Sequence, residues 1–245
     1  MRVLLLGGTA EARDLAAALV EDGIDVVSSL AGRVQRPRLP AGETRLGGFG
    51  GVVGLQQALQ GYDVVVDATH PFAATISRSA ATACEAARRP LLRLTRPSWA
   101  ALPGSSRWRW VESSEEAAAA AADIGGPVFL TTGRKSLHRF LPLLGETRVL
   151  VRVVDPLDWE PPATWTVLLA RGPYTLDGEL SLMREHQVDV LVTKDSGGDL
   201  TRAKLDAAGA LDVPVVVVRR PAAPGGVEEV SDVPGALRWL RARRG

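Results

Sequence analysis

Three residue types are scarce in this sequence, namely cysteine, histidine and tyrosine. The chain has 245 residues, of which one is cysteine, three are histidine and two are tyrosine. The single cysteine, Cys84, excludes an internal disulfide framework and a cysteine metal cluster, and it fits a reducing cytoplasm. We interpret Cys84, which lies in a predicted helix, as a small buried hydrophobic residue. The histidines have no zinc-binding spacing, so we expect no metal site.

An excess of one charge and a long apolar run are also missing. The formal net charge is +1, which disfavours a surface that binds nucleic acid. The apolar run at the start, Val3–Leu6, stops at a glycine turn and an acidic helix, so it predicts neither a signal peptide nor a membrane span. We therefore expect a soluble, cytoplasmic monomer that binds neither membranes nor nucleic acid.

Short apolar segments alternate with helical patterns along the whole chain. Because 46% of the residues are hydrophobic, the chain can bury one large or two small cores. The alternation predicts an α/β fold whose parallel strands bind ligands at their carboxyl ends. The predicted strands span residues 3–6, 25–29, 44–46, 62–68 and 91–94 in the first half, and 128–131, 148–153, 167–170, 190–193 and 213–218 in the second. The predicted helices include residues 71–87, 114–123, 136–143, 176–186, 199–209 and 233–243.

Residues 96–107 interrupt this alternation. Their sequence, RPSWAALPGSSR, contains two prolines, one glycine and three serines, a composition typical of a linker. We therefore predict two Rossmann-like domains, residues 1–98 and 99–245, with mainly parallel sheets and a ligand cleft between them.

The first eighteen residues predict a phosphate-binding loop. A short apolar strand is followed by Gly7 and Gly8, and an alanine-rich helix begins at Thr9. The first amides of such a helix are unpaired, and together with the helix dipole they favour a phosphate. Only two glycines of the usual dinucleotide fingerprint GxGxxG are present, so the alternative is that they only turn the strand into the helix.

The end of the second predicted strand favours NADP over NAD. This strand, Asp25–Ser29, lacks the terminal acidic residue that binds a ribose hydroxyl of NAD. It ends in Ser28 and Ser29, and Arg33 and Arg36 follow. Hydroxyl groups and arginines suit a 2′-phosphate. The alternative is that both arginines are ordinary solvated loop charges.

Three predicted strands of the second half end in a cation and a glycine. They lead into residues 131–135 (TTGRK), 170–174 (ARGPY) and 193–198 (TKDSGG). Because parallel strands present their carboxyl ends at one edge, these cations predict a pocket for an anion. The alternative is a set of glycine turns with solvated cations.

A further motif, DATHPFA, spans residues 67–73 at the end of a predicted central strand. Pro71 suits the first turn of the following helix, with Thr69 or His70 near its cap. Histidine as a residue type titrates near neutral pH, and His70 follows a strand end where a nicotinamide or its reaction partner would lie.

Seven motifs together resemble the precorrin-6A reductase family of cobalamin biosynthesis. In chain order they are LLGGTAEAR, SSLAGR, DATHPFAATIS, LLRLTRPSW, TTGRKSL, ARGPYT and VTKDSGG, and they cover nearly the whole sequence. The resemblance implies a two-domain Rossmann-like reductase with NADPH bound mainly by the first domain and a tetrapyrrole between the domains. The implied reaction reduces a carbon–carbon double bond in ring D of precorrin-6A, giving precorrin-6B without flavin or metal.

The expected site residues combine these motifs with the chemistry of a ring that bears many carboxylate arms. We expect Gly7, Gly8, Thr9, Ala10 and Glu11 at the pyrophosphate, Ser28 and Arg33 at the 2′-phosphate, and Thr69, His70 and Pro71 at the nicotinamide. The expected substrate-binding residues are Lys135, Arg171, Tyr174, Lys194, Ser196 and Gly197. The candidate proton donors are His70, Lys194 and Asp195, with solvent as the alternative.

Three other functions compete with this interpretation. A short-chain dehydrogenase needs Tyr-x-x-x-Lys, yet Val66 and Gly178 stand four residues after Tyr62 and Tyr174. A non-enzymatic NADP-binding redox sensor would leave the basic strand ends of the second domain without a role. A cobalt-precorrin-6A reductase of the anaerobic branch looks alike at these motifs, so the sequence leaves the metal content of the substrate open.

Overall fold

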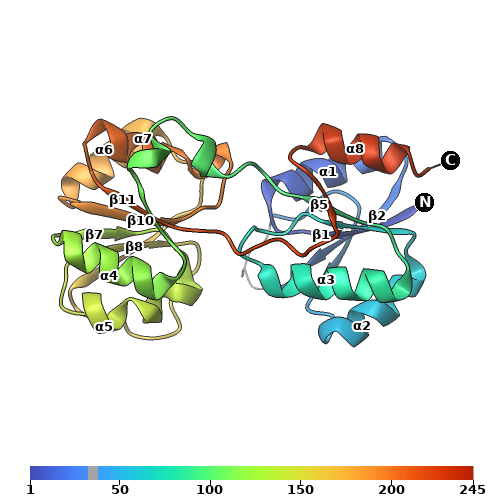
Figure 1. The fold of residues 1–245 in the computed structure, drawn as a ribbon, viewed down its shortest axis with the longest axis horizontal. Coiled ribbons are helices and arrows are strands. Elements are labelled where there is room, and N and C mark those ends of the chain that lie inside the picture. The colour runs from blue at the N-terminus through green and yellow to red at the C-terminus, as the bar shows by residue number, and fades with distance from the viewer. Residues whose placement is uncertain (33–37, 245) are drawn as a thin grey trace. The chain divides into compact units, whose positions relative to one another are not determined.

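The computed structural model describes residues 1–32 and 38–244. It divides into two compact units, of which unit 1 comprises Met1–Arg96 with Pro221–Gly245 and unit 2 comprises Pro97–Arg220. Each unit contains one six-stranded parallel sheet with helices on both faces (Figure 1). The predicted α/β class with Rossmann-like architecture is therefore confirmed.

Unit 1 has the strand order β12-β5-β4-β1-β2-β3. Its elements are β1 (Arg2–Leu6), α1 (Ala10–Glu21), β2 (Asp25–Leu30), β3 (Glu43–Leu46), α2 (Gly51–Ala58), η1 (Leu59–Gly61), β4 (Val64–Asp67), α3 (Ala74–Ala87), β5 (Leu91–Leu94), β12 (Glu228–Val230) and α8 (Val233–Arg241). The chain passes from β1 to β2 on one side and from β4 to β5 on the other. The loops that follow β1 and β4 therefore diverge at a topological switch point, where open parallel sheets bind ligands.

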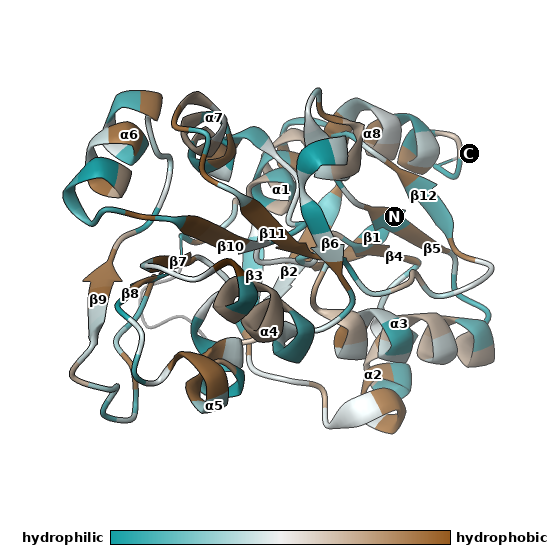
Figure 2. Ribbon diagram, turned by 60° about the vertical axis from the view of Figure 1, so that its left-hand side comes forward, coloured by the Kyte–Doolittle hydropathy of each residue, from teal (hydrophilic) through white to brown (hydrophobic). Residues whose placement is uncertain are grey.

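The central strands of unit 1 are apolar because both of their faces are covered (Figure 2). Successive side chains of a strand point to opposite faces, so Leu5 packs in the cluster that contains Leu15 of α1 and Leu240 of α8. Leu4 packs on the other face with Leu55 of α2. Because helices pack on both faces of these strands, only the loops at the carboxyl ends of the strands are left to contact a ligand.

Unit 2 has the strand order β6-β11-β10-β7-β8-β9. Its elements are η2 (Trp99–Ala101), η3 (Ser105–Arg107), β6 (Arg109–Val111), α4 (Ser114–Ile124), β7 (Val128–Leu130), η4 (Arg134–Arg139), α5 (Leu141–Leu144), β8 (Val149–Val153), β9 (Trp165–Leu169), α6 (Leu176–Glu185), β10 (Val190–Lys194), η5 (Asp199–Thr201), α7 (Ala203–Ala210) and β11 (Val215–Val218). The chain leaves β7 toward β8 and leaves β10 toward β11. A second switch point thus lies between β7 and β10.

The division of the chain differs from the predicted domains in its last segment. Residues 221–245, expected in the second domain, belong to unit 1, where β12 pairs with β5 and α8 buries Ala236 and Leu240 in the core. The sequence did not predict that the chain returns to unit 1, because β12 has only three residues, of which Glu228 and Glu229 are charged and exposed. The segment 221–232 therefore showed no apolar run that would predict a strand.

Some predicted helices begin elsewhere. The helix expected over 71–87 begins at Ala74, because residues 70–73 form a turn in which the Ala73 amide donates to the His70 carbonyl at 2.7 Å. The helix expected over 136–143 is divided into η4 and α5, with Pro142 in the first turn of α5. In the described ranges, no helix is long and apolar enough to cross a membrane.

Truncating a side chain of α8 tests its place in the core of unit 1. Because Leu240 is fully buried, we expect Leu240→Ala to lower the free energy of unfolding by about 3 kcal/mol through lost burial and a cavity. The matched control is Leu143→Ala, since Leu143 is 52% exposed. Urea unfolding measures both variants, and equal losses would contradict the assignment of α8 to this core.

Candidate functional site

The loop after β1 forms an open backbone cradle. The Gly7 amide donates to the Ser29 carbonyl at 3.0 Å, which fixes the loop against β2. Gly8 has a φ of 120°, and a Cβ placed there would meet no atom within 4 Å. Thr9 caps α1 by accepting from the Ala12 amide at 3.1 Å. The cradle therefore leaves space at Gly8 for a phosphate at the N-terminus of a twelve-residue helix.

Thr9 also ties this loop to the one that follows β4. Its hydroxyl donates to the Ala68 carbonyl at 2.9 Å. In the second loop, Asp67 is buried and its Oδ1 accepts from the Thr69 amide at 3.1 Å and from the Thr69 hydroxyl at 2.6 Å. The loops containing Gly8 and His70 are thus held together at the switch point of unit 1.

His70 is oriented by its own turn. Its Nδ1 accepts from the Phe72 amide at 3.2 Å, so the proton of the neutral ring lies on Nε2. Pro71 beside it is buried.

Glu11, expected at the pyrophosphate, forms an ion pair. Both of its carboxylate oxygens accept from Nη1 of Arg96, at 3.2 and 3.3 Å. A carboxylate in the first turn of α1 is favourable to the helix dipole, but it would repel a phosphate. The pair brings the cation of Arg96, which the sequence analysis did not single out, to the carboxyl edge of unit 1.

The structure describes only some of the residues expected near the 2′-phosphate. Arg33 and Arg36 lie outside the described residues. Ser28 is 1% exposed, and its Oγ has no hydrogen-bond partner in the described part of the chain. Arg45 of β3 lies beside Ser29 in the sheet and donates from Nη1 to its Oγ at 3.1 Å. This arginine was missed because β3 and its register are needed to bring it to the edge.

In unit 2, Lys194 lies at the carboxyl end of β10. Its Nζ donates to the Ser136 hydroxyl at 3.2 Å. Burial of the side chain, with a smaller effect from the charge of Arg139, lowers the pKa of Lys194 to about 8. Lys135 is exposed on η4 of the neighbouring loop. Two of the predicted cations therefore lie on loops at the second switch point.

Asp195 follows Lys194 and has a different environment. It is 3% exposed, and it accepts from the Ser98 hydroxyl at 2.6 Å and from the Trp99 amide at 2.9 Å. Arg220 donates to it from Nε at 3.0 Å and from Nη2 at 3.3 Å. Asp195 therefore anchors the segments that contain Ser98, Trp99 and Arg220. The turn after it contains Ser196 and Gly197, which has a φ of 65°.

The third predicted edge segment is held by a buried ion pair. Arg152 of β8 and Glu179 of α6 form two hydrogen bonds, of which Nη2 to Oε2 measures 3.0 Å. The Tyr174 ring lies 3.7 Å from the Arg152 guanidinium, and its hydroxyl donates to the Ala170 carbonyl at 3.0 Å. Tyr174 therefore holds the loop in place, while Arg171 is exposed.

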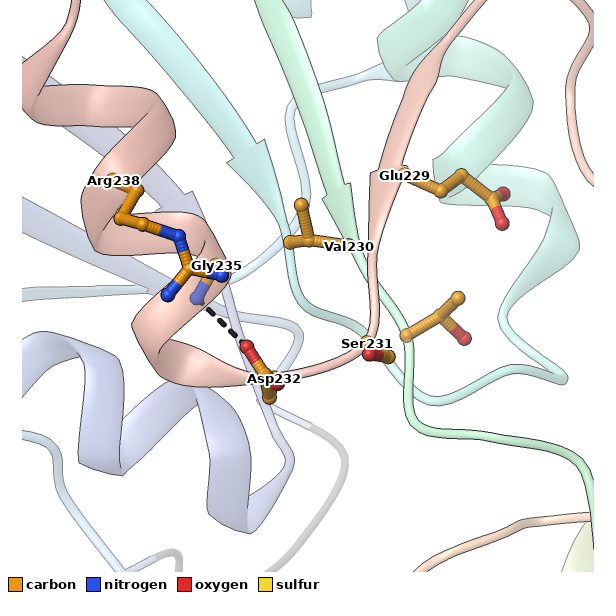
Figure 3. A pocket seen from close by; sticks show the side chains of 7 residues that line it. Glu229, Val230, Ser231, Asp232, Gly235 and Arg238 are labelled. Carbon is orange, nitrogen blue, oxygen red and sulfur yellow. Dashed lines mark hydrogen bonds between the residues drawn. The ribbon is translucent and has the colours of Figure 1, made fainter.

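A cavity of about 360 Å³ lies at the carboxyl ends of β5 and β12 in unit 1 (Figure 3). Thr95 and Ser231 line it, and Arg238 comes from α8. Asp232 caps α8 by accepting from the Gly235 amide at 2.7 Å. None of these residues was predicted as a site residue, and the cavity depends on the C-terminal segment that the sequence analysis placed in the other domain.

The glycine cradle and the switch-point loops define a Rossmann-like α/β protein with nucleotide-binding features. The family model described as Precorrin-6x reductase CbiJ/CobK matches residues 2–241, and the chain belongs to this family. The chain is 50% identical over 242 residues to precorrin-6A reductase of Rhodococcus erythropolis, covering 98% of this chain and 97% of that protein. It is 31% identical over 236 residues to cobalt-precorrin-6A reductase of Priestia megaterium, covering 89% and 90%. A solved structure described as CobK precorrin-6A reductase has a TM-score of 0.92 and 37% identity, with 100% of this chain and 98% of that chain covered.

These comparisons confirm the predicted family and its oxidoreductase class. A reductase family with a Rossmann-like fold implies a nicotinamide cofactor. The residues of unit 1 fit such a group, because the open space at Gly8 lies beside the N-terminal amides of α1. Membership of a reductase family removes the reason to invoke a redox sensor.

Replacement of Asp195 separates an anchor from a proton donor. We expect Asp195→Asn to lower the free energy of unfolding by about 2 kcal/mol, because it removes the charge that pairs with buried parts of Arg220. Asp199→Asn, at an exposed position on η5, is the control. Chemical denaturation gives both values. A variant with wild-type stability and no turnover would instead support proton donation by Asp195.

Proposed function

We propose that this chain is an NADPH-dependent precorrin-6A reductase that reduces the ring D double bond of precorrin-6A and gives precorrin-6B. The observation that carries the proposal is the full-length agreement with proteins of that name, at 50% identity in Rhodococcus erythropolis. The protein named cobalt-precorrin-6A reductase in Priestia megaterium is 31% identical. This difference favours the metal-free substrate, and the cobalt form remains the second candidate. We also infer a cytoplasmic monomer, as the sequence predicts.

In this proposal unit 1 binds the cofactor. The backbone of Gly7, Gly8, Thr9 and Ala10 holds the pyrophosphate at the N-terminus of α1. The loop 69–71 borders the nicotinamide, and His70 offers Nε2 as a donor to a neighbouring oxygen. When bound, NADPH supplies the hydride.

Arg45 is our candidate for the 2′-phosphate. Its guanidinium is held beside Ser29 and lies 3.8 Å from the Phe49 ring, so it is already ordered before a ligand binds. The sequence-based candidates are Ser28 and Arg33. Both stay predictions, since the buried Ser28 hydroxyl has no hydrogen-bond partner among the described residues and Arg33 lies outside them.

Unit 2 binds the tetrapyrrole in this proposal. Lys135, Arg171 and Lys194 supply cations for its carboxylate arms, and the Ser196–Gly197 turn borders the same edge. Exposed apolar side chains gather there as well, since Leu169 ends β9, Leu176 begins α6 and Leu200 lies on η5. The apolar faces of the tetrapyrrole ring can pack against these side chains.

The proton for the second carbon comes from solvent in this scheme. Asp195 is committed to four hydrogen bonds, and the Nδ1 of His70 is an acceptor. Lys194 acts through its positive charge, which holds a carboxylate arm and so orients the ring.

The direct test is anaerobic incubation of the purified protein with precorrin-6A and either NADPH or NADH. Oxidation of NADPH together with a gain of two hydrogens in product mass is the expected result. Turnover of cobalt-precorrin-6A alone would select the second candidate. Binding of NADPH without turnover of either tetrapyrrole would refute the proposed activity.

Arg45→Met tests the cofactor preference. Loss of a charge-assisted contact is expected to weaken NADPH binding tenfold or more and to leave NADH binding nearly unchanged. Arg2→Met, at the amino-terminal end of the central strand β1, is the control. Calorimetric titration of both cofactors also allows comparison with Arg33→Ala. Equal losses for NADPH and NADH in Arg45→Met would reject the 2′-phosphate role.

The charge of Lys194 predicts a pH dependence. Since its pKa is lowered to about 8, the ammonium is present below that pH and is lost above it. We expect kcat/KM for precorrin-6A to fall above a pH of about 8, because this ratio reports groups of the free enzyme. Lys194→Arg keeps its charge and should remove the fall in this range. An unchanged profile in Lys194→Arg would assign the fall to another group.

A further inference from the structure

Thr132 has a buried hydroxyl group that the fold does not satisfy. The residue is 3% exposed, and its Oγ1 has no hydrogen-bond partner among the residues that the structure describes. A buried hydroxyl without a partner is unusual in a folded protein, because the group has lost its hydrogen bonds to water and has gained none from the protein. A ligand that accepts a hydrogen bond would supply the missing one.

The position of Thr132 is that of a ligand-binding residue. It follows β7, which pairs in parallel with β10 in the register Leu130 to Val192. Thr132 stands two residues beyond the end of β7, and Lys194 is the last residue of β10. The chain leaves β7 and β10 in opposite directions, so both residues lie at the switch point of unit 2, where open α/β sheets bind ligands.

Ser136 connects the two residues. Its hydroxyl lies 3.2 Å from both the Thr132 and the Gly133 carbonyl oxygens, to which it can donate, and it accepts from Nζ of Lys194 at 3.2 Å. Ser136 is 5% exposed. The ammonium group is therefore held at the loop that contains Thr132.

The charges around this loop favour an anion. Arg139 of η4 is close enough to disfavour the charged form of Lys194. Glu115 accepts from Arg139 at 2.6 Å, and Asp195 pairs with Arg220, so both of these carboxylates already have a cation. An arriving carboxylate would meet the ammonium group of Lys194 and a hydroxyl donor.

We propose that Thr132, Ser136 and Lys194 form a subsite for one carboxylate arm of the substrate. The Thr132 hydroxyl donates a hydrogen bond to one carboxylate oxygen, Lys194 supplies the charge, and Ser136 positions Lys194. The subsite rests on the proposed function for its ligand, although its chemistry applies to any alkyl carboxylate.

The first test removes the hydroxyl of Thr132 and keeps its volume. We expect Thr132→Val to raise KM for precorrin-6A about tenfold or more with little change in kcat, because a hydrogen bond to a charged group is lost. Thr132→Ser keeps a hydroxyl and should restore most of the affinity. The matched control is Thr164→Val, which removes a hydroxyl bonded to the Gly145 carbonyl at 2.7 Å, before β9 at the opposite edge.

The second test does not depend on turnover. The chain has three lysines, Lys135, Lys194 and Lys204, so lysine-selective Cε labelling gives three NMR signals, and Lys194→Arg identifies one of them. Acetate, added without any nicotinamide cofactor, is expected to raise the pKa of Lys194 by about one unit in the wild type. The rise should be much smaller in Thr132→Val and unchanged in Thr164→Val.

The two tests separate this inference from the proposed function. A response to acetate that requires Thr132, in a protein that does not turn over precorrin-6A, supports the subsite and refutes the proposed substrate. Turnover of precorrin-6A with the same KM and the same Lys194 response in Thr132→Val refutes the subsite and leaves the reductase activity standing.

Discussion

The buried carboxylate of Asp195 joins the segments at which the chain enters and leaves unit 2. It receives hydrogen bonds from Ser98 and Trp99, where the chain enters unit 2, and from Arg220, where the chain leaves it. A buried charge is tolerated only when it is paired, so these segments must converge on one point. Because Asp195 directly follows Lys194, the same contact fixes the end of β10 and the loop that we assign to the substrate.

In both units a side-chain hydroxyl group forms a hydrogen bond across the switch point. Two segments of the chain diverge there, and no strand lies between them to hold them together. Thr9 connects the loops after β1 and β4 in unit 1, and Ser136 connects the loop after β7 with the end of β10 in unit 2. In the proposed function their ligands differ, because unit 1 offers backbone amides, whereas unit 2 offers a cation.

The sequence predicted the strands and turns that depend on a local pattern of residues. The apolar runs of β1 and β4 and the glycines after β1 were recognisable, because burial on both faces and a tight turn each leave a local signature. Pairings between distant residues left none. Glu11 and Arg96 are 85 positions apart, so the sequence suggested a phosphate contact for Glu11 where the structure has an ion pair. The roles of Asp195 and Thr132 depend in the same way on strand register and on the return of the chain.

The return of residues 221–245 to unit 1 also constrains synthesis of the protein. A nascent chain that has passed Arg220 contains all of unit 2, but it lacks β12 and α8 of unit 1. Until the ribosome has made the last segment, Leu15 and Leu19 of α1 lack part of the apolar cover that α8 provides. Domains usually fold in the order in which they emerge. Here the unit begun first is completed last, so the apolar face of α1 gains part of its cover only when α8 has been made.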